Sequence, residues 1–346
     1  MNKKRLLSIF RLGLVNLSPF VFALTFACNS DNSGRGSRSQ PPPAASDKKG
    51  GIVAYHPDYR DTPSNDQLDR LTHLVLFSIT PTNHDVPLPS GWGSNWPSNI
   101  NDIVNRAHDR GVKVIIALGG WGKTGSFPDS VKPANRQTFV NNIMALVNQY
   151  NFDGVDIDWE YPNTNEEVAN FEGFMVALKA ALGNKRLSFA IGAQYQPNKY
   201  TDATYNALDA LHLMTYDGLT RNRPHHADMT WSKSVVDRWV NSGKLGKEKI
   251  FYGVPFYGRK GNDWNDWEEE TYAVIISSDQ AAYSQTDSAN GWRYDGIPQI
   301  KEKTKYAWDK DIGGIMIWET GQDVAATDQY SLLRAIYEET KRLREQ

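Results

Sequence analysis

The stretch Phe152-Asp153-Gly154-Val155-Asp156-Ile157-Asp158-Trp159-Glu160 alternates acidic and apolar side chains. Successive side chains of a β-strand point to opposite faces, so Asp156, Asp158 and Glu160 share one face of a strand. Val155, Ile157 and Trp159 then form the other, apolar face. Three carboxylates on one face are costly unless they are protonated, hydrogen-bonded or bound to a metal ion. The pattern therefore indicates a strand whose carboxyl groups take part in catalysis, although a polar strand face or a divalent-metal site would give the same alternation.

Crowded carboxylates favour acid–base chemistry. Like charges close together raise the pKa of at least one member, and a carboxyl group with a raised pKa suits a general acid. In a barrel of parallel strands, the apolar face would contact the surrounding helices. The acidic face would line the interior and approach the C-terminal rim, where active sites of that fold lie.

The rest of the chain predicts such a barrel. Short apolar runs alternate with amphipathic stretches, which is the pattern of parallel βα units. The strand-like runs are Gly51–Tyr55, His73–Ile79, Lys113–Gly119, Gly154–Glu160, Leu187–Ala193, Ala210–Tyr216, Ile250–Phe256 and Gly313–Trp318. The helical patterns are Asn99–Arg110, Arg136–Tyr150, Glu166–Leu182, Ser232–Ser242 and Ser331–Arg344. Eight runs predict a (β/α)8 TIM barrel. An open doubly wound sheet has a similar alternation, but no GxGxxG follows any run.

The N-terminus predicts export. Residues 1–28 combine a basic start with the apolar run Leu12–Ala27, and the chain's only cysteine, Cys28, follows directly. This segment resembles a bacterial lipoprotein signal in which Cys28 would carry the lipid and anchor the protein to a membrane at the cell envelope. An ordinary signal peptide cleaved nearby, with secretion, is the alternative. Residues 29–49 are rich in Ser, Gly and Pro and predict a flexible linker, which leaves 50–346 as a single catalytic domain.

The composition excludes some functions. A formal net charge of −2 gives no indication of a nucleic-acid-binding surface. An aromatic content of 12% suits either a core of large side chains or flat platforms for sugar rings. We expect no metal ion: the adjacent His225 and His226 lie in a Pro-containing loop and are typical of a solvated turn.

The motifs resemble those of glycoside hydrolase family 18, the chitinases and their relatives. Residues 153–160 contain the family's DGxDxDxE signature in full. Four further segments resemble its other strands in the same order, covering most of 50–346: Ala117-Leu118-Gly119-Gly120, Met214-Thr215-Tyr216-Asp217, Gly253–Arg259 and Gly314–Glu319.

The resemblance implies a retaining glycosidase that uses the substrate's own acetamido group and needs no cofactor. By this resemblance Glu160 protonates the glycosidic oxygen, Asp158 holds the acetamide N–H, and Asp156 holds or exchanges a proton with Asp158. Tyr216 and Asp217 orient the acetamide, and Trp318 stacks under the sugar. The remaining expected substrate-binding residues are Tyr55, Gly119, Gly120, Trp121, Met214 and Arg259, although Arg259 would equally serve as the partner of a buried carboxylate. The implied substrate is chitin or an N-acetylglucosamine oligosaccharide, bound by a monomer.

Two departures from the family pattern change what we expect of the enzyme's rate and of its groove. Ala117 replaces a serine whose hydroxyl would bond the lower aspartate, which predicts slower turnover or a shifted pH profile. The stretch Lys260–Ile312 is short for a full α+β insertion domain plus a barrel helix, which predicts a shallow, open groove and internal cuts.

Two rival functions remain: an endo-β-N-acetylglucosaminidase acting on the chitobiose core of N-glycans, and a chitin-binding lectin. Six tryptophans in loops are equally suited to packing or to binding flanking sugars: Trp92, Trp96, Trp121, Trp264, Trp267 and Trp292.

Overall fold

The computed structural model describes residues 49–346 except 91–92, 221 and 264–265. The predicted signal segment, Cys28 and nearly all of the predicted linker lie outside the described residues. No helix within the described ranges is long and apolar enough to cross a membrane.

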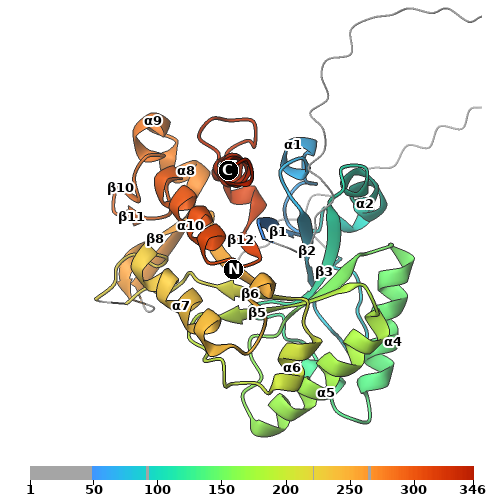
Figure 1. Cartoon of the computed structure of the whole chain (residues 1–346). Helices are drawn as coiled ribbons and strands as arrows, with labels where there is room; N and C mark the ends of the chain where they lie inside the picture. The colour runs from blue at the N-terminus through green and yellow to red at the C-terminus, as the bar shows by residue number, and fades with distance from the viewer. Residues whose placement is uncertain (1–48, 91–92, 221, 264–265) are drawn as a thin grey trace, which may run out of the picture. The chain divides into compact units, whose positions relative to one another are not determined.

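The described chain forms a closed barrel of parallel strands (Figure 1). Its strands are β1 (Gly51–Pro57), β2 (His73–Ile79), β3 (Lys113–Gly119), β4 (Gly154–Asp158), β5 (Arg186–Gly192), β6 (Ala210–Met214), β7 (Ile250–Pro255) and β12 (Gly314–Trp318). Their order around the barrel is β1-β12-β7-β6-β5-β4-β3-β2, so the last strand closes against the first. The predicted TIM barrel is confirmed, and each predicted strand lies within a few residues of an observed one.

Helices follow the strands and cover the outside of the barrel. They are α1 (Asn65–Leu68), α2 (Ile100–His108), α3 (Phe127–Ser130), α4 (Arg136–Gln149), α5 (Asn165–Leu182), α6 (Asp202–Ala207), α7 (Met229–Ser242), α10 (Ile297–Asp309) and α11 (Leu332–Arg344). Short 3₁₀ turns span Pro97–Asn99, Lys247–Lys249 and Thr320–Gln322. A capping box between Thr164 and Glu167 starts α5, so the loop that leaves Glu160 is short.

The segment between β7 and α10 forms a small subdomain. It contains a four-stranded sheet, in the order β10-β11-β8-β9, and two short helices. The elements are β8 (Tyr257–Asp263), β9 (Asp266–Thr271), α8 (Tyr272–Ile276), α9 (Gln280–Tyr283), β10 (Ser288–Ala289) and β11 (Trp292–Arg293). Figure 1 shows α8 and α9 on the same side of the barrel as α10. The length of Lys260–Ile312 predicted too little room for a full α+β insertion and a barrel helix together, but two-residue strands and one-turn helices fit a compact version of both.

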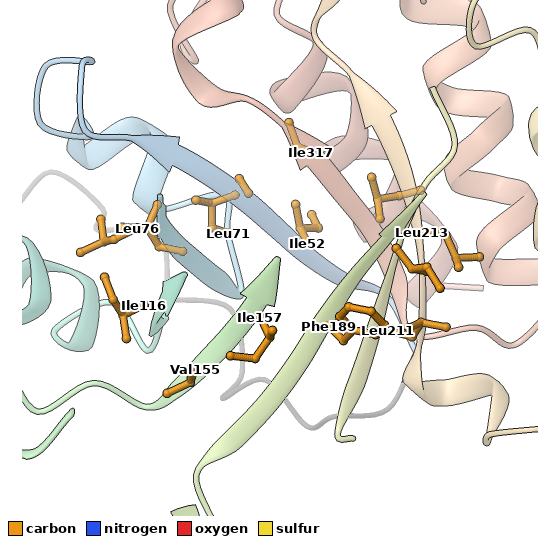
Figure 2. Close-up of a cluster of buried hydrophobic side chains, with 14 of the residues drawn as sticks. Ile52, Leu71, Leu76, Ile116, Val155, Ile157, Phe189, Leu211, Leu213 and Ile317 are labelled. Atoms are coloured by element: carbon orange, nitrogen blue, oxygen red, sulfur yellow. The ribbon is translucent and has the colours of Figure 1, made fainter. Parts of the chain in front are cut away.

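The apolar core has two layers that follow from strand alternation. Outward-facing side chains such as Val155, Ile157, Phe189 and Leu211 belong to one cluster with residues of the helices, and Figure 2 shows these four on the strands. Trp159 belongs to this layer and stacks on Phe127 with ring centroids 5.4 Å apart. Inside the barrel, a second cluster contains mostly aromatic and small residues. Asp156 and Asp158 share the barrel interior, with 0% and 3% exposure, so the predicted division of the β4 faces is correct.

Candidate active site

Asp156, Asp158 and Glu160 form a row of carboxyl groups, called the acidic row below. Asp156 lies at its base, where side chains from other strands donate hydrogen bonds to it. The Tyr55 hydroxyl donates to its Oδ2 at 2.7 Å, and the Ser188 hydroxyl donates to its Oδ1 at 2.5 Å. The His212 Nδ1 lies 3.3 Å from the same Oδ1 and 2.8 Å from the Tyr55 hydroxyl oxygen. These side chains come from β1, β5 and β6, so three strands besides β4 converge on one carboxyl group.

Asp158 lies one step higher and has the opposite environment. Its Oδ1 has no hydrogen-bond partner among the described residues although it is buried. Burial raises the pKa of Asp158 well above its ordinary value, and the charges of Glu160 and Asp156 raise it further. Burial without donors therefore favours the protonated form of Asp158, and its Oδ1 is free to accept a bond from a ligand.

Glu160 lies at the rim, just beyond the last residue of β4, and is half-buried. The Tyr161 hydroxyl donates to its Oε2 at 2.9 Å. Burial raises the pKa of Glu160 and the nearby charge of Asp217 adds to this, while bonds from Tyr161 and from the Trp121 backbone oppose it. Because the net pKa shift is upward, Glu160 keeps its proton to a higher pH than an exposed glutamate, as a general acid requires.

Asp217 follows β6 and is surrounded by donors. Tyr257 donates to its Oδ1 at 2.5 Å and the Arg259 Nε donates to the same oxygen at 2.6 Å. His226 Nδ1 lies 3.4 Å away. Burial alone would raise the pKa of Asp217, but its contacts with His226 and Arg259 outweigh it and hold the pKa well below its ordinary value. Asp217 is therefore an anion.

Three aromatic rings lie against one another at the interior end of the site. Trp318 meets Phe77 edge to face at 4.7 Å between ring centroids and lies 5.8 Å from Tyr55. Met214, the last residue of β6, is partly buried against the same cluster. Tyr216 is buried, and burial raises the pKa of its hydroxyl well above the ordinary value. The Tyr216 phenol therefore stays neutral and can donate a hydrogen bond.

Gly119 and Gly120 leave space for close packing at the end of β3. Both have positive φ, at 102° and 106°. A Cβ at Gly119 would lie 2.2 Å from the Asp158 carbonyl oxygen, and one at Gly120 would lie 2.2 Å from the Phe77 ring. The two glycines therefore let β3 approach β4 and the aromatic cluster.

The tryptophans considered as platforms for sugars differ in their exposure to solvent. Trp121 is 82% exposed beside the site, and Trp267 is 38% exposed with Arg259 stacked 3.5 Å from its ring centroid. Trp96 is fully buried and packs in the core, whereas Trp292 is partly buried. Trp92 and Trp264 lie outside the described residues.

The structure brings the predicted site residues to one end of the barrel and adds others. The additional residues are Ser188, His212, Tyr161, Tyr257, His226 and Phe77. Strand alternation was the available signal for two of them, because Ser188 and His212 face inward on β5 and β6. The solvated turn expected at His225 and His226 is wrong for His226, which is fully buried next to Asp217. Arg259 is 5% exposed and pairs with Asp217, the arrangement expected of a carboxylate partner.

Ala117 is the register neighbour of Asp156 on β3, and Ser188 is its register neighbour on β5. The hydroxyl that Ala117 lacks is therefore present on the opposite side of the same carboxyl group. Among the residues that the structure describes, no three His, Cys, Asp or Glu side chains are grouped so as to hold a metal ion.

Comparison with known proteins agrees with this geometry. Residues 51–323 match the family model for glycosyl hydrolases family 18. Chitinase 1 of Aphanocladium album is 26% identical over 339 residues, which cover 77% of this chain and 79% of that protein. Chitinase B of Serratia marcescens is 25% identical over 387 residues, covering 75% of this chain and 76% of that protein.

A solved structure is similar over nearly the whole barrel. The family 18 chitinase from the chitin utilization locus of Flavobacterium johnsoniae superposes with a TM-score of 0.70 at 27% identity, covering 86% of this chain and 95% of that one. With the family model matched over most of its length, this chain is a glycosidase and belongs to glycosyl hydrolases family 18.

Proposed function

We propose that this glycosidase hydrolyses β-1,4-linked N-acetylglucosamine polymers, chitin or chitooligosaccharides, with retention of configuration. The observation that carries the proposal is the arrangement on β4: Glu160 at the rim lies above the buried Asp158, whose Oδ1 has no partner among the described residues, and burial raises the pKa of both groups. A second carboxylate positioned as nucleophile is not needed if the substrate supplies its own. The similar proteins named above are chitinases, which supports the same substrate.

Cleavage begins with Glu160 as general acid. It gives its proton to the glycosidic oxygen while the carbonyl oxygen of the substrate's 2-acetamido group attacks the anomeric carbon. The bond to the leaving sugar breaks, and the carbonyl oxygen and anomeric carbon form an oxazolinium ion. Water, deprotonated by the Glu160 carboxylate, then opens this ring from the opposite face, which restores the glutamic acid and gives net retention.

Asp158 and Asp156 stabilise the positive charge of that intermediate. The unpartnered Oδ1 of Asp158 accepts the acetamide N–H. As the charge grows, the Asp158 proton passes to Asp156, which leaves an anion next to the acetamide.

The surrounding residues bind the sugar. Tyr216 and Asp217 orient the acetamide, Trp318 supports the sugar ring at the cleavage position, and the exposed Trp121 offers a face to a neighbouring sugar. Tyr55 is 2% exposed, with its hydroxyl on Asp156 and its ring near Trp318, so it supports this floor from below.

Product analysis by mass spectrometry tests the proposal and its rivals. A protein starting after Cys28 is incubated with chitohexaose and, separately, with a high-mannose glycopeptide. Short chitooligosaccharides from the hexamer alone are expected, and β-anomeric products at early times by NMR would agree with retention. Release of the glycan with one N-acetylglucosamine left on the peptide would instead indicate an endo-β-N-acetylglucosaminidase. Binding to chitin without any cleavage would favour the lectin.

The N-terminal segment carries a separate proposal. We propose that Cys28 is lipidated and anchors the enzyme at the cell envelope, with residues 29–49 as the tether to the barrel. In a bacterial host, the full-length protein should incorporate a labelled fatty acid and fractionate with membranes, and Cys28→Ala should abolish both. A Cys28→Ala variant that remains in the membrane fraction would show that another part of the segment is the anchor.

A further inference from the structure

A lysine and an aspartate form a fully buried ion pair where α10 meets the small subdomain. Lys303, in the middle of α10, donates from Nζ to Asp295 Oδ2 at 2.6 Å, and both side chains are 0% exposed. Gln299, one turn earlier on the same face of α10, donates to the other carboxylate oxygen. Two apolar side chains of similar size often pack in such a place without loss of stability, so packing alone does not account for the pair.

The ammonium group of Lys303 has a further bond, to the loop between β6 and α7. Its Nζ donates to the carbonyl oxygen of Ala227 at 2.6 Å, across 76 residues of sequence. An apolar side chain would fill the same space but could not donate this bond. The bond to Ala227 therefore connects α10 to the loop that carries Asp217.

His225 fixes the same loop to the small subdomain. Its Nδ1 lies 3.1 Å from the backbone nitrogen of Ala227, and its Nε2 lies 2.9 Å from the carbonyl oxygen of Tyr294. A backbone N–H only donates and a carbonyl only accepts, so Nδ1 is the acceptor and Nε2 carries the proton. Burial lowers the pKa of His225 to about 4, which agrees with a neutral ring. The loop is thus held at Ala227 from two directions.

His226 lies between these two anchored residues and contacts Asp217. The backbone N–H of Asp217 donates to His226 Nδ1 at 3.3 Å, and the Gly218 N–H donates to the His226 carbonyl oxygen at 2.8 Å. The same Nδ1 lies 3.4 Å from Asp217 Oδ1. The place of His226, and with it that of Asp217, therefore depends on the bonds that hold His225 and Ala227.

We propose that Lys303 is a positioning residue: its bond to the Ala227 carbonyl holds the loop after β6 so that His226 keeps Asp217 in the place needed to orient the substrate's acetamido group. Asp295 directs the ammonium group, and His225 is the second tie. This inference rests on the proposed function, because the acetamido group is the one that Asp217 orients there. Lys303 has no exposed surface with which to touch substrate, so it acts through the main chain of the loop.

Removing one or both members of the ion pair separates positioning from folding. In the whole 346-residue chain, Lys303→Met leaves Asp295 buried without its cation, so the melting temperature should fall. Adding Asp295→Asn removes that charge and keeps an oxygen for Gln299, so most of the melting temperature should return. The bond to Ala227 is absent from both variants. We therefore expect kcat/KM on chitohexaose to stay about tenfold below the wild type in the double variant, mainly through kcat.

Recovery of kcat/KM together with the melting temperature would overturn the inference, because the pair would then serve folding alone. Lys305→Met is the matched control. Lys305 lies on the same helix, is exposed and pairs with Asp309 on the helix surface. Its replacement makes the same chemical change as Lys303→Met and should alter neither the melting temperature nor the kinetics by much.

Hydrogen exchange followed by mass spectrometry tests the loop without any activity. The N–H groups of Asp217 and Gly218 are bonded to His226, so they are protected while the loop is held. In the double variant, the peptide that contains them should exchange about tenfold faster, whereas peptides from β4 should exchange as in the wild type. Unchanged exchange of the loop peptide would overturn the inference even if the enzyme cleaves chitohexaose. If the wild type cleaves nothing, the proposed function fails, and the exchange still decides whether Lys303 holds the loop.

The tie made by His225 provides a second test, which remains available if the Lys303 variants do not fold. Glutamine can place an N–H near the position of the histidine Nε2 and keep the bond to the Tyr294 carbonyl, whereas leucine cannot. We expect His225→Leu to lower kcat by about threefold and to speed exchange of the loop peptide, and His225→Gln to recover most of both. Equal kinetics and equal exchange in the two His225 variants would overturn the inference.

Discussion

Two groups of carboxyls lie at the same end of the barrel and differ in the donors that reach them. Asp158 and Glu160, on and just after β4, have raised pKa values because burial and neighbouring acids act in the same direction. Asp217, after β6, experiences burial too, but Arg259, His226 and Tyr257 surround it. Its pKa is lowered. Burial is thus common to both groups, and the partners decide which carboxyl is an acid and which is an anion.

The difference assigns separate tasks to the two groups. A group that must release a proton to a leaving oxygen needs a raised pKa, which burial provides at Asp158 and Glu160. A group that orients a ligand by accepting hydrogen bonds needs a fixed charge and a fixed position. Asp217 receives both from the β8 residues Tyr257 and Arg259, so the small sheet contributes to the site through this carboxylate.

The largest expected effect comes from replacing Glu160, the general acid at the rim of the barrel, by a side chain that cannot give up a proton. Glu160→Gln keeps the size and polarity of the side chain but cannot protonate the leaving oxygen, so kcat on chitohexaose should fall by about 10²-fold or more. Affinity for the oligosaccharide, measured by calorimetry, should stay within a few-fold of the wild type. Activity within a few-fold of the wild type would remove Glu160 from the role of acid and would erase the distinction drawn between the two groups.

A smaller effect is expected from removing the cation beside Asp217. Arg259→Met keeps an unbranched side chain but leaves the half-buried Asp217 carboxylate without its ion pair, so kcat/KM should fall by roughly tenfold, about 1.4 kcal/mol of binding to the transition state. Lys260→Met is the matched control, because Lys260 is exposed on the same strand and should change activity little.

The same variant has a pH signature in stability. The folded-state pKa of Asp217 is lowered, so its ionisation stabilises the fold above the unfolded pKa of about 3.9 and this stabilisation is lost as the pH falls. The difference in melting temperature between the wild type and Arg259→Met should therefore be largest near neutral pH and should shrink in acid. A difference that is constant across pH would mean that Arg259 stabilises the protein through packing on Trp267 instead.

Sequence patterns predicted the barrel and the acidic row because both depend on local periodicity. Alternation placed Asp156 and Asp158 inside and Val155 and Ile157 outside, and the structure agrees. The donors around Asp156 depend on which residues meet across neighbouring strands. Register is set by the closure of the whole barrel, so Ser188 and His212 could be assigned to an inner face but not to a particular carboxylate.

The small sheet and the buried His226 were missed for a related physical reason. Two-residue strands such as β10 and β11 have no periodicity to detect, and their pairing with β8 is made by tertiary contacts. An adjacent His pair in a loop looks solvated until another segment covers it. Here Tyr257 covers His226, with ring centroids 4.9 Å apart, and the sequence gives no local sign of that contact.

The smallest expected effect concerns the side-chain donor that reaches Glu160 at the rim. The Tyr161 hydroxyl stabilises the Glu160 carboxylate and so opposes the upward shift of its pKa. Tyr161→Phe removes that bond, which should raise the pKa of Glu160 further. Because the acid must be protonated to act, the basic limb of the kcat–pH profile should move to higher pH, with the maximal rate changed by only about threefold. Tyr195→Phe is the matched control, since the Tyr195 ring lies 4.4 Å from that of Tyr161 but its hydroxyl makes no described bond to Glu160. A limb that moves to lower pH, or moves equally in both variants, would show that partners do not set the acidity of Glu160 as they set the charge of Asp217.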